Sequence, residues 1–152
     1  MRYALSLAKR APPKSTNYCV RAVLVDETSN RILSTGYIMK LPGNTHAEQC
    51  CLAKAAEGIE SHGEALPSLA LYITMEPCNQ RTSGNTLCTK TILKATSDLK
   101  CRIKIVYVGV QESEKFVGKN TERFKLENVG IKYVHVSGLE DEILAVATSG
   151  HL

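Results

Sequence analysis

The chain has 152 residues, which suits one domain with a hydrophobic core, and its 43% hydrophobic content is ordinary for a globular protein. The net charge of +4 and the lack of tryptophan argue against a dedicated nucleic-acid binder, but they permit an anionic small-molecule ligand. No apolar run approaches the roughly 20 residues of a membrane span, and residues 1–14 lack the apolar block of a signal peptide. We therefore expect a single domain, 1–152, in a reducing cytoplasmic or nuclear compartment, where six cysteines indicate metal binding or catalysis rather than disulfides.

Helical and strand patterns alternate along the chain. The first helix must end at the prolines that follow Ala11. Two strands joined by a turn over 27–30 form an antiparallel hairpin, and the later strands, separated by helices, favour parallel pairing. The predicted elements are a helix before residue 11, strands 18–25 and 31–39, helix 45–59, strand 69–75, helix 89–99, strand 103–110, helix 119–128, strand 131–136 and helix 140–148. This order predicts an α/β fold with three α-β-α layers and a five-stranded mixed sheet.

Three metal-binding side chains stand where predicted elements begin or end. His46 opens the helix over 45–59, Cys78 follows the strand over 69–75, and Cys88 opens the helix over 89–99. Because the ends of neighbouring elements meet at one edge of an α/β sheet, we expect the three to converge. One imidazole and two thiolates suit Zn²⁺ and leave a fourth position for water, which ionises far more easily there than in bulk. Taken without His46, the two cysteines could equally be a disulfide or core residues.

Glu48 lies two residues after His46, close enough to exchange a proton with that water. A structural interpretation competes with this one. Thr45 and Glu48 also match a capping box, in which the glutamate at the third helical position stabilises the start of the helix. The sequence leaves both interpretations open.

The remaining cysteines and histidines are expected to be structural. Cys50 lies four residues after His46 and shares its helix face, so it is the main rival metal ligand. Core positions are predicted for Cys19, Cys50, Cys51 and Cys101. Surface or structural positions are predicted for His62, His135 and His151.

Several runs resemble the cytidine deaminase-like superfamily. They are GNTHAEQ at Gly43–Gln49 and TMEPC at Thr74–Cys78, which match the His-x-Glu and Pro-Cys parts of the zinc deaminase pattern. Most of these enzymes place their second cysteine three positions after the first. The long segment between Cys78 and Cys88 instead resembles the pyrimidine deaminases of riboflavin biosynthesis, especially the fungal form. Further similarity, at 16–20 and 109–131, extends the resemblance over nearly the whole chain.

The resemblance implies a cytidine deaminase-like fold, zinc held by His46, Cys78 and Cys88, and Glu48 as the proton carrier. The implied reaction is hydrolytic deamination of a diaminopyrimidinone 5′-phosphate with a ribitylamino or ribosylamino side chain, with release of ammonia. The fungal character of GNTHAEQ favours the ribityl compound. The superfamily commonly self-associates, so a homodimer is the expected assembly.

The chain departs from these relatives at several positions around the expected substrate site. Arg21 stands where many relatives have glycine, and Asn79 and Gln80 replace histidines of the bacterial loops. Within the loop over 79–87, Arg81 could pair with a phosphate, although it could equally be a solvated charge. Hydrogen bonds to the base or the polyol are expected from Asn17 and Asn85.

Two other functions are compatible with these patterns. The first is a deaminase of another substrate, such as deoxycytidylate, cytidine or a tRNA adenosine, although the long segment between the cysteines argues against it. The second is a catalytically silent zinc scaffold that pairs with another subunit. Glu48 argues against the scaffold, because a scaffold does not need a proton carrier.

Overall fold

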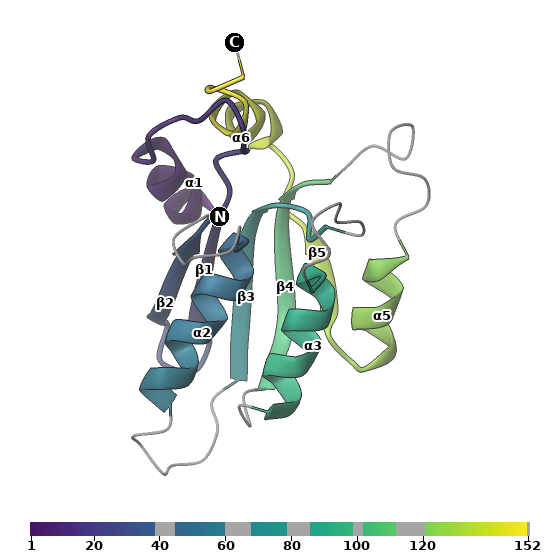
Figure 1. Ribbon diagram of the computed structural model, residues 1–152. Coiled ribbons are helices and arrows are strands. Elements are labelled where there is room, and N and C mark those ends of the chain that lie inside the picture. Colours follow the sequence, from purple (N-terminus) through teal and green to yellow (C-terminus); the bar gives the residue numbers. More distant parts are fainter. Residues whose placement is uncertain (39–44, 60–67, 79–85, 99–101, 112–120, 152) are drawn as a thin grey trace.

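A computed structural model describes residues 1–38, 45–59, 68–78, 86–98, 102–111 and 121–151 of the chain (Figure 1). The elements follow the predicted order of helices and strands. They are α1 (Arg2–Lys9), β1 (Arg21–Asp26), β2 (Arg31–Tyr37), α2 (Ala47–Ile59), β3 (Ser68–Met75), α3 (Cys88–Asp98), β4 (Arg102–Val110), α5 (Glu122–Asn128), β5 (Lys132–His135) and α6 (Glu140–Ala147). No helix among the described residues is long and apolar enough to cross a membrane.

The strands form one mixed sheet in the order β2-β1-β3-β4-β5. Strand β1 pairs antiparallel with both β2 and β3, whereas β3–β4 and β4–β5 are parallel pairs. The β1–β2 turn is held by Asp26, whose carboxylate accepts hydrogen bonds from the backbone N–H groups of Thr28 and Ser29. The predicted five-stranded mixed sheet, with its antiparallel hairpin and parallel second half, is confirmed.

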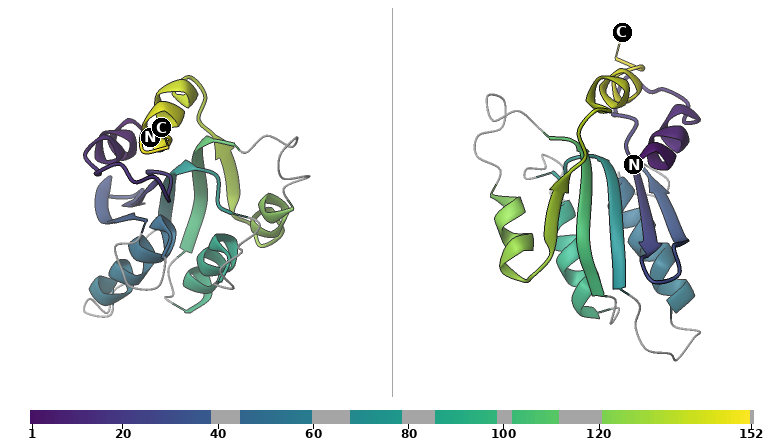
Figure 2. Two further views of the ribbon diagram at one scale, coloured as in Figure 1. Left: turned by 45° about the horizontal axis from the view of Figure 1, so that its top comes forward. Right: turned by 180° about the vertical axis from the view of Figure 1, so that it is seen from behind.

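Helices α2, α3 and α5 cover one face of the sheet, and α1 and α6 pack on the other face near the carboxyl ends of β3 and β4 (Figures 1 and 2). The first face holds the main core, where alternate residues of β3 (Leu69, Leu71 and Ile73) meet apolar residues of the three helices. A smaller core joins Leu5 of α1 and Ile143 of α6 to Val110 at the end of β4. With one core on each face of the sheet, the helices and the sheet form the three predicted α-β-α layers.

Close packing fixes the position of α2 against the sheet. A Cβ atom added at Gly36 of β2 would lie 2.1 Å from the carbonyl oxygen of Ala47 and 2.5 Å from the backbone nitrogen of Cys51. Glycine therefore lets the start of α2 approach β2 directly. Ser34, on the same face of β2, donates a hydrogen bond to the carbonyl oxygen of Cys51 at 2.8 Å.

The predicted start of the first strand is wrong by three residues. Strand β1 begins at Arg21, whereas residues 18–20 lie outside the sheet. Their backbone groups find other partners: the N–H of Cys19 donates to the carbonyl oxygen of Ala147 in α6, and that of Val20 donates to the carbonyl oxygen of Tyr18. A run of apolar and β-branched residues cannot reveal such a distant partner, because the pattern reports only local preference.

Candidate metal centre and its pocket

His46 is placed by the first turn of α2, which begins at Ala47. Its backbone N–H donates to the side-chain oxygen of Gln49 at 2.9 Å, which satisfies one of the donors that a helix start leaves unpaired. Gln49 thus makes, one residue later, a bond of the kind that the capping-box interpretation gave to Glu48. The Glu48 side chain turns instead toward the pocket, which it helps to line together with His46.

The side chains of His46, Cys78 and Cys88 converge at the carboxyl end of β3. Their ligand atoms all lie within 4.8 Å of one another. The Nδ1 of His46 lies 3.0 Å from the sulfur of Cys88 and 3.7 Å from that of Cys78, and the two sulfurs are 3.3 Å apart. Both cysteines are free thiols in the structure, which differs from the disulfide that spacing alone left open.

These distances and donor types fit zinc. Ligands arranged tetrahedrally around zinc, at about 2.3 Å for sulfur and about 2.0–2.1 Å for nitrogen, lie roughly 3.5–3.8 Å from one another. The separation of 3.7 Å between Cys78 and His46 matches these edges, and the separations of 3.0 and 3.3 Å are shorter, so the Cys88 sulfur would move slightly away from the other two atoms to admit the cation. One imidazole and two sulfurs are also the donor set of zinc sites in this class of chemistry.

The protonation of the two thiols also favours a divalent cation at this position. The hydrogen bond with Cys88 lowers the pKa of Cys78 to about 4. The same contact with Cys78, together with burial, raises the pKa of Cys88. Without a cation only one of two adjacent sulfurs ionises easily, because two thiolates repel each other. A divalent cation between them removes this repulsion and lets both ionise.

Glu48 is buried, with 3% of its surface exposed, beside the three ligand residues. Burial raises the pKa of its carboxyl group, and the neighbouring His46 partly opposes this effect. A carboxyl group with a raised pKa holds its proton more readily and can serve as a proton carrier during a reaction. Glu48 therefore has the position and the environment of an acid–base group.

An open pocket with a volume of about 180 Å³ lies over these residues. Its walls come from the loop before β1, from the end of β3 and the residues after it, and from the start of α2. The lining residues are Thr16, Asn17, Tyr18, Val20, Ile38, His46, Glu48, Met75, Glu76 and Cys78. The structure thus brings Asn17, predicted to bind substrate, to the same pocket as Glu48. Arg81 and Asn85, predicted with it, lie outside the described residues.

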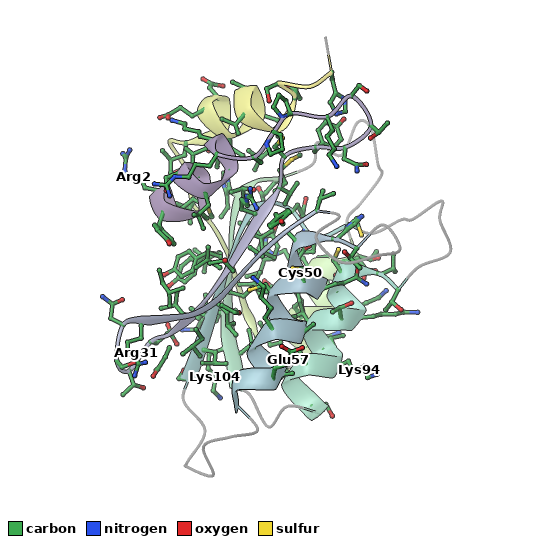
Figure 3. All side chains as sticks on the ribbon, turned by 60° about the vertical axis from the view of Figure 1, so that its left-hand side comes forward. Arg2, Arg31, Cys50, Glu57, Lys94 and Lys104 are labelled. Carbon is green, nitrogen blue, oxygen red and sulfur yellow. The ribbon has the colours of Figure 1, made fainter. Side chains whose placement is uncertain are left out.

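The rival ligand and the other predicted structural residues are placed away from the cluster. Cys50 is fully buried in the first turns of α2 and is not one of the three grouped ligands (Figure 3). Cys51 is buried against Ser34, as expected of a core cysteine. Cys19 is only half-buried, because it precedes the strand rather than lying in it, which corrects its predicted core position.

Two histidines confirm their predicted surface or structural positions. His135 pairs with Glu140 at 3.3 Å, and the ring of His151 stacks on Tyr18. Cys101 and His62 lie outside the described residues.

Arg21 does not belong to the pocket lining. Its Nε donates to the carbonyl oxygen of Leu7 at 3.1 Å, and its guanidinium lies 4.4 Å from the ring centre of Tyr37. Burial lowers the pKa of this guanidinium. Arg21 therefore ties the end of α1 to the sheet edge.

Sequence reasoning missed the pair Glu76 and Tyr133. Glu76 lines the pocket, and its carboxylate accepts a hydrogen bond of 2.6 Å from the phenol of Tyr133 in β5. Burial and this carboxylate raise the pKa of Tyr133. The position of Glu76 directly before Pro77 and Cys78 was a signal that could have marked it, whereas Tyr133 lies 57 residues away along the chain.

Comparisons with known proteins agree with this geometry. The family described as the cytidine and deoxycytidylate deaminase zinc-binding region matches residues 1–112. The diaminohydroxyphosphoribosylamino-pyrimidine deaminase of Schizosaccharomyces pombe is 34% identical over 148 residues, which make up 97% of this chain and 34% of that protein. The riboflavin biosynthesis protein RibD of Aquifex aeolicus is 35% identical over 144 residues, with 93% of this chain and 35% of that protein covered. The chain therefore spans about a third of the length of these two relatives.

Solved structures extend the likeness to the fold. The Rib2 deaminase of Aspergillus oryzae, a C-terminal deletion mutant at pH 4.6, has a TM-score of 0.82 and 42% identity, with 99% of this chain and 89% of that chain covered. The same deaminase in complex with DARIPP has a TM-score of 0.80 and 40% identity over 99% of this chain and 88% of that chain. The chain belongs to the cytidine and deoxycytidylate deaminase zinc-binding family, and its relatives include one protein named as a pyrimidine deaminase and one named as a riboflavin biosynthesis protein.

Proposed function

We propose that the chain is a zinc-dependent deaminase that hydrolyses the 2-amino group of a diaminopyrimidinone 5′-phosphate carrying a ribitylamino side chain. Its similarity to the Schizosaccharomyces pombe deaminase and to the Rib2 deaminase solved with DARIPP supports the substrate class. The long segment between Cys78 and Cys88 supports the riboflavin branch over the deaminases of nucleosides and nucleotides.

The ligands proposed for zinc are His46, Cys78 and Cys88. Zinc at this position supplies Lewis-acid chemistry that makes water a better nucleophile near neutral pH. Glu48 takes a proton from the water that attacks the ring carbon bearing the 2-amino group. It gives this proton to the adjacent ring nitrogen. It then takes the second proton from the hydroxyl group now on that carbon and gives it to the departing amine, so that a carbonyl group replaces the amino group and ammonia leaves.

The pocket wall would hold and orient the substrate. Asn17 offers an amide that can donate and accept hydrogen bonds with the base or the polyol. Arg81 is proposed to pair with the phosphate, since a guanidinium matches phosphate oxygens, and Asn85 to hydrogen-bond the substrate. These last two assignments rest on sequence.

The observation that carries the proposal is the buried carboxyl group of Glu48, which lines one pocket with the proposed ligands His46 and Cys78. At the start of the helix, it is Gln49 that accepts the hydrogen bond from the His46 N–H. A buried carboxyl group that lines the pocket favours a proton carrier over a silent zinc scaffold, because burial of an ionisable group is costly.

Ammonia release from the ribitylamino compound, run beside the ribosylamino compound and deoxycytidylate, tests the proposal. Release from the ribitylamino compound alone is expected. Release only from deoxycytidylate would assign the chain to the nucleotide deaminases, and zinc binding without release from any of the three would favour the scaffold. We further propose that residues 1–152 form a single zinc-dependent deaminase domain. We expect it to self-associate as a homodimer, which light scattering would test, and to lie in the cytoplasm, which cell fractionation would test.

A further inference from the structure

The loop before β1 supplies much of the pocket wall. Thr16, Asn17, Tyr18 and Val20 line the pocket, yet none of them belongs to a strand of the sheet. A pairing between Lys14 and Asn17 closes a tight turn at the start of this loop. Because the sheet does not hold the loop, other contacts must set the position of the wall.

Helix α6 and the segment that follows it make those contacts. The N–H of Cys19 donates to the carbonyl oxygen of Ala147, the last residue of α6, at 3.0 Å. The ring of His151 stacks on that of Tyr18, with centres 4.7 Å apart and planes 12° from parallel. The backbone N–H of His151 donates to the carbonyl oxygen of Thr148 at 2.8 Å, and this turn directs the segment back over the loop.

Gly150 lies directly against the turn that carries Asn17. A Cβ atom added there would lie 2.3 Å from the carbonyl oxygen of Lys14 and 2.5 Å from its backbone nitrogen. Backbone atoms cannot move aside as the end of a flexible side chain can, so a larger residue must displace either the segment or the turn. Three contacts of different kinds therefore join residues 147–151 to residues 14–19.

We propose that the segment 148–151 positions the substrate-binding wall, with Gly150 and His151 as positioning residues for Asn17 and Tyr18. This inference rests on the proposed function, because it assigns a role within the same pocket. Tyr18 is 47% exposed, so its ring has few other neighbours to fix its orientation, and a stacked aromatic partner restricts it. Neither Gly150 nor His151 belongs to the pocket lining or to the group of His46, Cys78 and Cys88, so their effect should fall on substrate binding rather than on the chemical step.

The test compares His151→Ala, Gly150→Val and His151→Phe in the full chain with the ribitylamino substrate. We expect His151→Ala and Gly150→Val to raise KM about five- to tenfold with kcat changed less than about twofold, because uniform binding is lost while the chemical groups stay in place. Zinc content should be unchanged. His151→Phe keeps a stacking ring and should restore KM to within about twofold of the native value. The matched control is His135→Ala, which removes a histidine of β5 that pairs with Glu140. It should leave KM unchanged.

Amide hydrogen exchange gives a readout that does not depend on the reaction. The Cys19 amide should exchange about tenfold faster in Gly150→Val than in the native protein, because its bond to Ala147 is disturbed. Unchanged exchange in residues 14–19, or KM values in the two disruptive variants equal to the native value, would overturn the positioning role. Failure of the native protein to release ammonia would refute the proposed function instead, and the exchange measurement would still decide whether the segment holds the loop.

Discussion

The backbone N–H of His46 is bound by the side chain of Gln49 at 2.9 Å, one residue beyond the position that a Thr45–Glu48 capping box requires. Because of this one-residue shift, neighbouring residues stabilise the helix start and serve as the proposed proton carrier. Gln49 stabilises the helix start and fixes the backbone of the proposed metal ligand His46, while Glu48 lines the pocket. The order His-Ala-Glu-Gln thus joins the ligand, the proposed proton carrier and the cap in four residues.

Replacing Gln49 by alanine tests this division. We expect Gln49→Ala to lower the free energy of unfolding by about 0.5–2 kcal/mol, because the His46 N–H loses its partner. Zinc affinity should also fall, by about tenfold, because the backbone that carries His46 is less constrained. Thermal unfolding and a zinc competition titration measure the two effects. Gln49→Glu keeps an acceptor at the same reach and should behave nearly as the native protein; equal losses in both variants would contradict the capping role.

Replacing Glu48 by glutamine tests its part in the reaction. Glutamine keeps the shape of the side chain but cannot carry the proton, so we expect kcat to fall by about 10²–10⁴-fold while zinc stays bound. Steady-state ammonia release and metal analysis on the same preparation separate the two properties. Glu57→Gln, on an exposed turn of the same helix, is the control and should leave kcat unchanged (Figure 3). Full turnover in Glu48→Gln would remove this residue from the mechanism.

The choice of cysteine ligands is tested by a pair of single-atom changes. Cys88→Ser should lose bound zinc, because a hydroxyl group does not ionise as a thiol does and is a poor replacement for thiolate. Cys50→Ser should keep zinc, because Cys50 is buried in α2 and lies outside the grouped ligand atoms. Zinc stoichiometry by atomic absorption gives the answer directly. The reverse pattern, with zinc lost only from Cys50→Ser, would mean that the ligand set is wrong.

Much of the fold and of the metal cluster was predictable from the sequence. Periodicity found every described helix and strand because each buries one face, as the alternation of Leu69, Leu71 and Ile73 does in β3. The cluster of His46, Cys78 and Cys88 was predictable because the three residues stand at element ends that an α/β topology brings to one edge.

What the sequence could not reveal depends on contacts between distant residues. Tyr18 to Val20 have the composition of a strand, but the carbonyl oxygen of Ala147 competes for the N–H of Cys19. The bond between Tyr133 and Glu76 joins β5 to the residue that follows β3, and these strands are not adjacent in the sheet, so no local pattern predicts it. Spacing alone likewise could not choose between Glu48 and Gln49 as the cap, since the two differ by a single residue in where the helix begins.

The phenol of Tyr133 is expected to orient Glu76 in the pocket. Tyr133→Phe removes the donor of a 2.6 Å hydrogen bond and leaves the carboxylate with one partner fewer. We expect the free energy of unfolding to fall by about 1–2 kcal/mol and KM for the ribitylamino compound to rise. Tyr107→Phe is the matched control, because Tyr107 stacks on Tyr72 in the sheet, outside the pocket lining. If the two variants shift KM equally, Tyr133 does not act through Glu76.

Cys51 should make the protein less stable at alkaline pH. Burial raises the pKa of its thiol from about 9 to about 11, so the folded state keeps a proton that the unfolded state has lost. The stabilisation is fully present below pH 9 and is lost as the pH rises through about 11. A difference of two pKa units between the folded and unfolded states corresponds to a change of at most about 2–3 kcal/mol in the free energy of unfolding.

Denaturant unfolding of Cys51→Ala at several pH values between 8 and 11 measures this contribution. The variant should be less stable than the native protein at pH 8, because a buried sulfur is removed, and the gap should narrow by roughly 2 kcal/mol toward pH 11. Ser34→Ala removes the neighbouring hydroxyl group, which contacts the Cys51 sulfur at 3.1 Å, but keeps the thiol. The free energy of unfolding of this variant should therefore still fall as the pH rises from 8 to 11. A constant gap between Cys51→Ala and the native protein across this range would show that Cys51 titrates alike in the folded and unfolded states.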